Sequence, residues 1–248
     1  MFWRKQKAAI ERFHPLHRSL TLEQGFSVSL RRDEWEPVIQ SLARHRAEIR
    51  RRRWRLSDRV PGVLVPLLRV LASDMPPDGV LSVAADMRGP KIPEKTGPQY
   101  DVPVQRPVLS LKQWFAMDPW LRMRAELRDG SVLELSVTDR VRYRRRRKRN
   151  PRGKVKIKTK TKTTHLVRVT RRLAKDAAVQ RPGTPPPPWI RVQVKQGNRM
   201  IFRANGKLPG PLGEAELTDR ILHVSTEPFR WTPPGRALPP GQATGRTT

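Results

Sequence analysis

Lysine and arginine occupy nearly every second position along two consecutive segments in the middle of this chain. Successive side chains of a β-strand point to opposite faces, so cations at this spacing share one face. No Asp or Glu occurs between Arg140 and Arg172, so nothing within the segment offsets the self-repulsion of that face. The chemistry it can perform is to neutralise phosphates and release their condensed counterions. The cations are Arg140, Arg142, Arg144, Arg146, Lys148, Arg152, Lys154, Lys156, Lys158, Lys160, Lys162 and Arg168.

A second cluster of cations lies near residue 50. The apolar residues before it recur at helical spacing, which predicts a helix over residues 32–54. The helix dipole stabilises one or two cations at the C-terminal end, and the cluster contains more than that. It is therefore a second candidate contact for a polyanion, with a solvated helix end as an equally favoured alternative. The cluster consists of Arg50, Arg51, Arg52, Arg53 and Arg55.

Residues for catalysis or metal binding form no recognisable motif. His14 and His17 have helical spacing, but Pro15 separates them and no carboxylate completes a ligand set. Phosphate-cradling glycine loops and the Gly-x-Ser-x-Gly elbow are missing, and the carboxylates are scattered. His165 falls on the less polar face of the alternating segment, where we expect it to be packed. We expect no enzyme activity, no metal and no cofactor.

The alternating segments predict a β-hairpin over about residues 131–172, folded back at residues 149–153. Pro151 suits the first central position of a tight turn, and Gly153 can take a positive φ. Arms of about 18 residues reach about 60 Å at roughly 3.3 Å per residue. Arg145 and Arg147 occupy positions where core residues would be needed. We therefore expect the outer half of this hairpin to project from the body.

The remaining segments predict an α+β fold. Residues 1–75 are expected to be a mainly helical part with one strand at 25–30, and residues 60–71 a buried helix. Residues 79–232 are expected to form a mainly antiparallel sheet or partly open barrel of six to eight strands. Within it we expect a loop at 86–107, an aromatic core group at helical spacing at 109–120, a hairpin at 189–204 and a strand at 220–225. The Pro/Gly/Thr-rich residues 233–248 are expected to be a disordered tail.

The composition limits the classes of partner. The chain has 248 residues, a formal net charge of +30 and no cysteine, which excludes disulfide frameworks and thiol nucleophiles. No apolar stretch approaches the length of a membrane span and no secretory leader is recognisable, which favours a cytoplasmic protein associated with a nucleoid or with RNA; organellar import remains an alternative.

Three partners remain open. The first is nucleic acid held by its phosphates independently of sequence. Tyr143 is the only aromatic residue of the expected hairpin, so base stacking is disfavoured and duplex DNA or structured RNA is expected. The second is a neighbouring acidic protein into which the hairpin reaches, in a structural or assembly role. The third, less favoured, is an anionic membrane surface.

Overall fold

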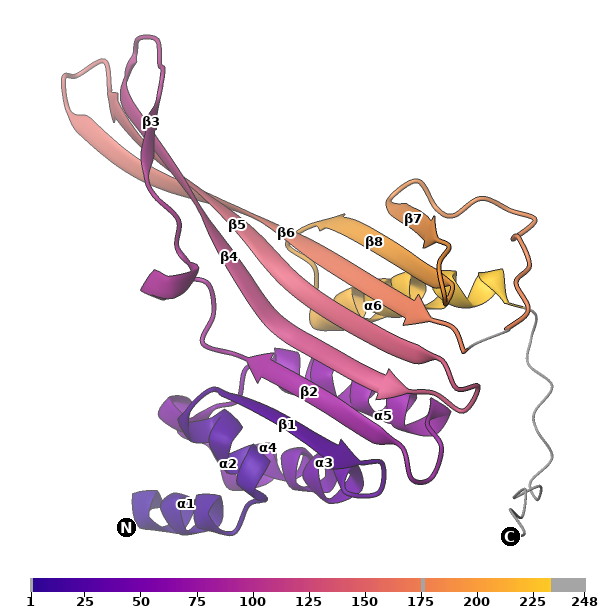
Figure 1. The fold of residues 1–248 in the computed structure, drawn as a ribbon. Coiled ribbons are helices and arrows are strands. Elements are labelled where there is room, and N and C mark those ends of the chain that lie inside the picture. Colours follow the sequence, from indigo (N-terminus) through magenta and orange to yellow (C-terminus); the bar gives the residue numbers. More distant parts are fainter. Residues whose placement is uncertain (1, 175–176, 233–248) are drawn as a thin grey trace, which may run out of the picture.

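An open antiparallel sheet of eight strands forms the centre of the protein (Figure 1). The structure is a computed structural model, and it describes residues 2–174 and 177–232. The strand order is β1, β2, β4, β5, β6, β8, β7, and the short β3 pairs with the outer part of β4. The bounds are β1 Gly25–Arg31, β2 Val80–Asp86, β3 Tyr100–Val102, β4 Val108–Glu126, β5 Val132–Arg149, β6 Val155–Arg172, β7 Ile190–Lys195 and β8 Ile201–Pro209. Together with the helices, this sheet confirms the α+β class, and it does not close into a barrel.

Strands β5 and β6 form the hairpin that the alternating sequence predicts. They are 18 residues each and pair antiparallel along their whole length. The turn between them is closed by the Lys154 carbonyl, which accepts from the Asn150 amide at 2.9 Å, and Gly153 has φ 79°. Arg142 faces Lys162 and Tyr143 faces Thr161. The even-numbered side chains of both strands therefore share one face, as their spacing requires.

The segment before the hairpin differs from its prediction. The aromatic residues at 109–120 suggested a helical core group, but they belong to β4, which runs alongside β5 over almost its whole length. The register of this pairing shifts between Pro119 and Leu121. Proline has no amide hydrogen to donate to a sheet, so it is tolerated at such an irregularity. The projection is therefore a sheet of three strands, not a two-stranded ribbon, and β3 adds a short fourth strand beside the outer part of β4.

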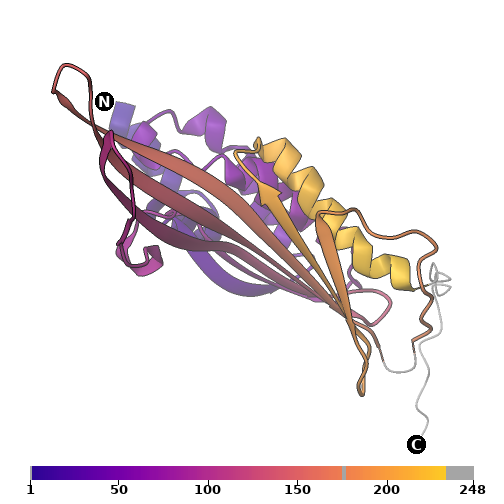
Figure 2. The ribbon, with the colours of Figure 1, turned by 90° about the horizontal axis from the view of Figure 1, so that it is seen from above.

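The helices cover one face of the sheet and leave the other open (Figure 2). Trp35 and Val38 of α3, Leu68 of α5 and Ile221 of α6 belong to one buried apolar cluster with the sheet. The bounds are α1 Phe2–Glu11, α2 Pro15–Leu22, α3 Trp35–Ala43, α4 His45–Glu48, η1 Arg52–Trp54, η2 Val60–Leu64, α5 Val65–Asp74, η3 Pro93–Lys95, α6 Glu214–Thr226 and η4 Glu227–Trp231.

Two helical predictions need correction. The helix expected at 32–54 ends at Ala43, and after the short α4 the chain becomes extended at Ile49. The strand expected at 220–225 is part of α6, which buries Leu217, Ile221 and Val224 at helical spacing. The buried helix expected at 60–71 is present as η2 followed by α5. The expected tail at 233–248 lies outside the described residues.

The outer halves of β4, β5 and β6 extend beyond the helices (Figures 1 and 2). Every residue from Arg144 to Lys162 is exposed, including Ile157 with 53% of its surface accessible. In contrast, Leu135 and Val167, on the inner halves of β5 and β6, are buried under the helices. The same strands thus serve as core in the body and as a projection beyond it.

Candidate nucleic-acid interface

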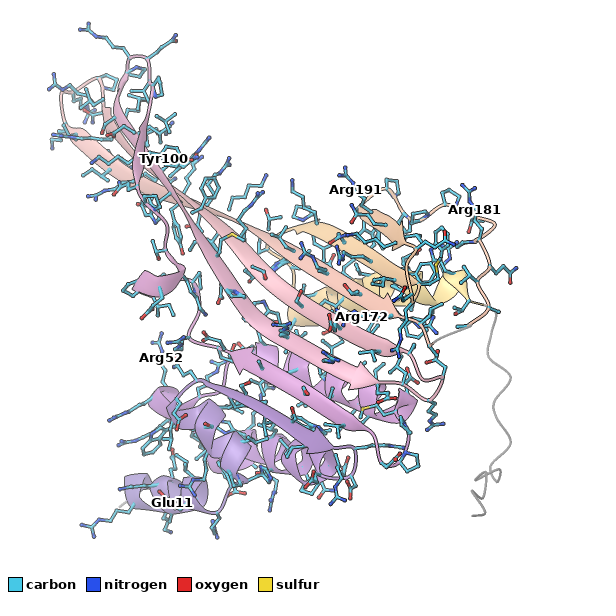
Figure 3. The ribbon with its side chains drawn as sticks, in the orientation of Figure 1. Glu11, Arg52, Tyr100, Arg172, Arg181 and Arg191 are labelled. Carbon is cyan, nitrogen blue, oxygen red and sulfur yellow. The ribbon has the colours of Figure 1, made fainter. Side chains whose placement is uncertain are left out.

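Pairs of cations face each other across β5 and β6 in the projecting part. Directly opposed like charges destabilise a sheet. In the part of the chain that the structure describes, none of these cations has a carboxylate within ion-pair distance, whereas Arg172, at the base of the same hairpin, has Glu134 at 3.2 Å. Figure 3 displays the long basic side chains around this end of the sheet. The pairs, here called the cation ladder, are Arg142 with Lys162, Arg144 with Lys160, Arg146 with Lys158 and Lys148 with Lys156.

The other predicted hairpin cations lie at the ends of the ladder or beyond it. Arg152 and Lys154 are exposed in the turn. Arg140, opposite Thr164, is half-buried at the root of the projection on the same face. Arg168 also shares this face, but it lies on the base of the sheet, where its Nε donates to Asn205 Oδ1 at 3.2 Å. The structure thus places all twelve predicted cations along one hairpin, with Arg168 set apart from the projecting end.

Strands β3 and β4 contribute side chains that the sequence analysis did not connect with the ladder. Arg144 Nε donates to Gln113 Oε1 at 2.5 Å, and the Gln113 amide donates to the Tyr100 hydroxyl. The ring of Tyr100, 44% exposed, lies 6.5 Å from that of Phe115. These contacts orient Arg144 in the ladder. They also place Tyr100 on the projecting part of the sheet (Figure 3).

Aromatic residues are therefore more abundant here than the hairpin alone suggested. On the opposite face, Trp114 stacks on Tyr143 with ring centroids 5.2 Å apart and an interplanar angle of 12°. Tyr143 is the only aromatic residue of the hairpin, as predicted, but β4 places Trp114 and Phe115 next to it. The argument against base stacking, which considered the hairpin alone, therefore loses its basis.

The open face of the sheet continues the cationic surface into the body. Its grooves have volumes of about 310, 700 and 360 Å³. Four of the lining cations, Arg122, Arg191, Arg203 and Lys207, were not predicted from the sequence, although the period-2 signal is there: Arg203 and Lys207 alternate with the buried Phe202, Ala204 and Leu208. The cations lining these grooves are Arg122, Arg140, Arg142, Lys162, Arg168, Arg191, Arg203 and Lys207.

The Arg50–Arg55 cluster lies apart from the ladder, beside the helices (Arg52 in Figure 3). Its five arginines are exposed, and they lie on an extended segment with one 3-10 turn rather than at the end of a long helix. Arg55 donates to Asp58 at 3.0 Å. Arg50 and Arg55 also border a cavity of about 600 Å³ whose floor includes Leu42 and Leu56. The cluster therefore does not belong to the same surface as the ladder.

Carboxylates gather where the projection joins the body. Asp118 and Asp139 lie opposite each other on β4 and β5 and are 0% and 1% exposed. Arg59 donates to both, at 3.3 and 2.5 Å, and stacks over Trp120 at 4.7 Å. Lys95 lies 2.5 Å from Asp118 and 2.9 Å from Asp86, with Nζ as the donor. The sequence could not reveal this cluster, because only the register of β4 on β5 brings the two aspartates together.

Cations surround the carboxylates of this cluster. The pKa of Asp86 is held well below its ordinary value, chiefly by the hydrogen bond from Arg88, with Lys95 adding to the effect against the opposing influence of burial. Arg59 forms ion pairs with Asp118 and Asp139, and Lys95 forms one with Asp118. Because these carboxylates are already engaged, they offer no open ligands for a metal ion. Among the described residues, no group of three or more His, Asp or Glu could hold one.

The N-terminal histidines have structural contacts. His14 caps α2, its Nδ1 accepting from the Leu16 amide at 3.2 Å. His17 and His45 share a hydrogen bond of 2.9 Å in the core. Burial lowers the pKa of His17 to about 3, and the neighbouring His45 adds to that effect. These rings are therefore neutral and packed.

No protein-family model matches this sequence, and neither a curated protein nor a solved structure shows significant similarity to it. Within residues 2–174 and 177–232, none of the helices combines the length and the apolar character needed to cross a bilayer. The function is accordingly argued from the surface itself.

Proposed function

We propose that the protein binds nucleic acid through its phosphate backbone, largely independently of sequence and without catalysing a reaction. The observation that carries this proposal is the cation ladder, in which four pairs of cations face each other without a counterion in the described part of the molecule. Such an arrangement costs folding free energy. A polyanion that supplies the missing negative charge removes this cost and gains counterion-release entropy.

The geometry of the ladder suits a charged polymer rather than a single small anion. Side chains on one face of a strand repeat at about 6.6–7 Å, and the two strands lie about 4.8 Å apart. The ladder therefore offers two adjacent rows of cations along the same direction. Gln113, an amide beside the ladder, is engaged by Arg144 and Tyr100, so it is not free to read a base edge. We infer backbone-dominated binding to duplex DNA or structured RNA.

The binding surface is proposed to run from the tip of the projection onto the open face of the sheet. Arg140, Arg168 and Lys207 border grooves that lead away from the ladder. Phosphate contacts position a nucleic acid without reading its sequence. The longer the surface, the more phosphates it neutralises at once, and the steeper the expected dependence on salt.

The two alternatives make different demands on the structure. A membrane-bound protein needs an exposed apolar face, but Ala9, Ile10 and Phe13 of the N-terminal segment are buried against Ile49. An acidic protein partner is supported by the outer edge of β6, which pairs with β8 only from Thr164 onward and can accept another strand. Binding measurements on nucleic acid and on liposomes separate these alternatives from the proposal.

The test is a salt titration of binding to duplex DNA, structured RNA and anionic liposomes. A variant with Lys154, Lys156, Lys158, Lys160 and Lys162 changed to Gln is expected to bind nucleic acid more weakly. The slope of log affinity against log salt should become shallower by roughly one unit for each phosphate that the variant no longer neutralises. The matched control changes Arg50, Arg51, Arg52, Arg53 and Arg55 to Gln and removes the same number of charges elsewhere.

The control is expected to retain most of the affinity and the slope. Equal weakening in both variants would mean that net charge, not the ladder, determines binding. Unchanged affinity in the lysine variant, or binding to liposomes alone, would overturn the proposal and leave the acidic-partner or membrane alternative.

A further inference from the structure

A small pocket lies at the root of the projection, on the face opposite the cation ladder. Its volume is about 290 Å³, at the lower end of the range for small-molecule sites. The walls come from β5, β6, the segment before α6 and the first turn of α6. Tyr143, Thr161 and His165 form its strand side, and Pro211, Leu212 and Glu214 face them.

One buried nitrogen on this pocket has no hydrogen-bond partner. His165 is only 6% exposed, and its Nδ1 lies 2.7 Å from Asp139 Oδ1. Because an ionised carboxylate only accepts, Nδ1 carries a hydrogen, and in the tautomer with its hydrogen on Nδ1 the Nε2 atom is an acceptor. No described group donates to Nε2. A buried acceptor without a donor is unfavourable, so a ligand with an N–H group would stabilise this site.

Gly210 packs closely against Nε2. A Cβ atom at this position would come within 2.9 Å of His165 Nε2 and 3.4 Å of the Thr163 carbonyl oxygen. Distances below 3.0 Å require the neighbouring atoms to shift. A side chain at 210 would therefore press on the ring nitrogen, next to Pro211, Leu212 and Glu214 of the pocket wall.

The opposite wall carries a second polar atom without a partner. Glu214 Oε2 is buried and unpaired. Burial raises the pKa of Glu214, against the opposing influence of the nearby Arg59 guanidinium. Burial thus favours the protonated carboxyl, which offers one donor and one acceptor. The two walls together present an acceptor and a group able to donate or accept.

This set of groups suits a neutral planar ligand better than an anion. Arg59 also borders the pocket, but Asp118 and Asp139 already neutralise it. Lys91, the other cation of the lining, is exposed and lies at the rim. Tyr143 supplies an aromatic wall and stacks on Trp114, while Pro211 and Leu212 are apolar. A nucleobase has the matching features: a flat apolar face, N–H donors and ring acceptors.

We propose that this pocket takes up one unpaired nucleobase of a nucleic acid whose backbone is held by the projecting strands, with a base N–H donating to His165 Nε2. The inference deepens the proposed function and rests on it. Structured RNA supplies unpaired bases in loops and bulges. Enclosure of an extruded base between aromatic and apolar side chains, with hydrogen bonds to its edge, is an established mode of recognition. The exposed Lys91 lies where it can contact the adjoining phosphate.

The experiment compares two single strands of equal length, an oligodeoxycytidylate and the corresponding abasic deoxyribose-phosphate strand. Both carry the same phosphates, so only the first can fill the pocket. The parent protein is expected to bind the base-containing strand about fivefold or more tightly than the abasic strand. Equal affinity of the parent for the two strands would overturn the proposal.

Three variants test whether the tighter binding of the base-containing strand arises at this pocket. His165→Asn keeps an N–H toward Asp139 but removes the Nε2 acceptor, Glu214→Gln alters the opposite wall, and Gly210→Ala places a methyl group against Nε2. Each is expected to bring the ratio of the two affinities toward one while leaving binding to the abasic strand unchanged. If the folded variants all keep the parent ratio, the pocket is not the base site, and Gly210→Ala remains informative if His165→Asn fails to fold.

Two further measurements distinguish a failure of this proposal from a failure of the proposed binding to the phosphate backbone. If binding of the abasic strand depends neither on salt nor on the change of Lys154, Lys156, Lys158, Lys160 and Lys162 to Gln, the proposed binding to the phosphate backbone is overturned, whatever the ratio of the two affinities is. Free cytidine monophosphate distinguishes a base within a strand from a free nucleotide. We expect it to bind more weakly than the strand, and tighter binding would overturn the assignment of a strand-borne base.

Discussion

Charged side chains are arranged in opposite ways in the body of the protein and in its projecting end, although β4, β5 and β6 run through both. In the body, Asp118 and Asp139 face each other across two strands, and Arg59 and Lys95 neutralise them. In the projecting end, cations face cations and no described carboxylate compensates them. In the body, opposite charges therefore neutralise each other within the molecule. In the projecting end, neutralising the positive charge requires anions from another molecule.

This difference separates charges that stabilise the fold from charges that are available for binding. A buried ion pair is costly to break, because the remaining charge has no water to solvate it. An exposed cation in a strand adds little to stability and can add repulsion. Position along the same strand, rather than residue type, therefore decides the role of each charge.

The largest expected effect comes from removing a charge in the body. Arg59→Leu leaves two buried aspartates with fewer counterions and should lower the free energy of unfolding by about 3–5 kcal/mol. Urea unfolding measures this. The control Arg55→Leu breaks the exposed pair with Asp58, which should cost less than about 1 kcal/mol. A loss for Arg59→Leu as small as for the control would mean that the carboxylate cluster is solvated.

The second prediction concerns histidines that the body keeps neutral. The pKa of His17 is lowered to about 3, from 6.5 in the unfolded chain, and burial lowers the pKa of His45 as well. Between these values the unfolded chain binds the proton and the folded chain does not. Stability should therefore fall as the pH decreases below 6.5, by up to about 1.4 kcal/mol per pH unit for His17.

Urea unfolding between about pH 7.5 and pH 5 tests this slope. His17→Gln removes the titrating ring and should flatten the profile, even if the variant is less stable throughout. The exposed His223 provides the control, and His223→Gln should keep the parent slope. A parent profile that is flat in this window would show that His17 titrates normally in the folded state. A separate loss of stability, due to the lowered pKa values of Asp86 and Asp129, is confined to pH values below about 4.

The smallest expected effect comes from neutralising the projecting end. Changing Lys156, Lys158 and Lys160 to Gln relieves opposed charges and should leave the free energy of unfolding unchanged or raise it by about 1 kcal/mol at low salt. Thermal unfolding at low and high salt measures the gain, which should shrink as salt screens the repulsion. Leu135→Ala, in the body part of β5, is the contrast and should cost about 2–5 kcal/mol. Destabilisation by the lysine changes would mean that these side chains hold the fold.

The alternating segments allowed the hairpin, its turn and the face of its cations to be predicted from the sequence. The prediction worked because period 2 fixes the face of each side chain, and Gly153 marks the turn. The part of β4 before residue 121 was missed because Trp114, Phe115, Met117 and Trp120 do not alternate with polar residues. Phe115 and Met117 lie toward the open face, Trp114 and Trp120 toward the other, and the irregularity near Pro119 interrupts the period.

Helix α6 was predicted as a strand because a segment as short as residues 220–225 does not distinguish the two kinds of element. Residues 220–225 contain Ile221, Leu222 and Val224, which suggest a strand when viewed alone. Only the longer stretch from Glu214 reveals that Leu217, Ile221 and Val224 share one side of a helix. The pocket was equally hidden, because His165 and Glu214 are 49 residues apart in the numbering and meet only through the packing of α6 on the sheet. No local pattern in the sequence predicts that His165 and Glu214 line the same pocket.

The outer edge of β6 has a consequence for how molecules of this protein behave toward one another. Beyond Thr164 toward the tip, this strand pairs with β5 alone, so one row of its backbone amides and carbonyls is open among the described residues. An open edge invites another strand, and lysines along it keep such edges apart. The ladder lysines are therefore expected to hinder such pairing, in addition to making the phosphate contacts proposed for them. Replacing them with apolar residues, rather than with Gln, should convert the projection into a site of edge-to-edge aggregation.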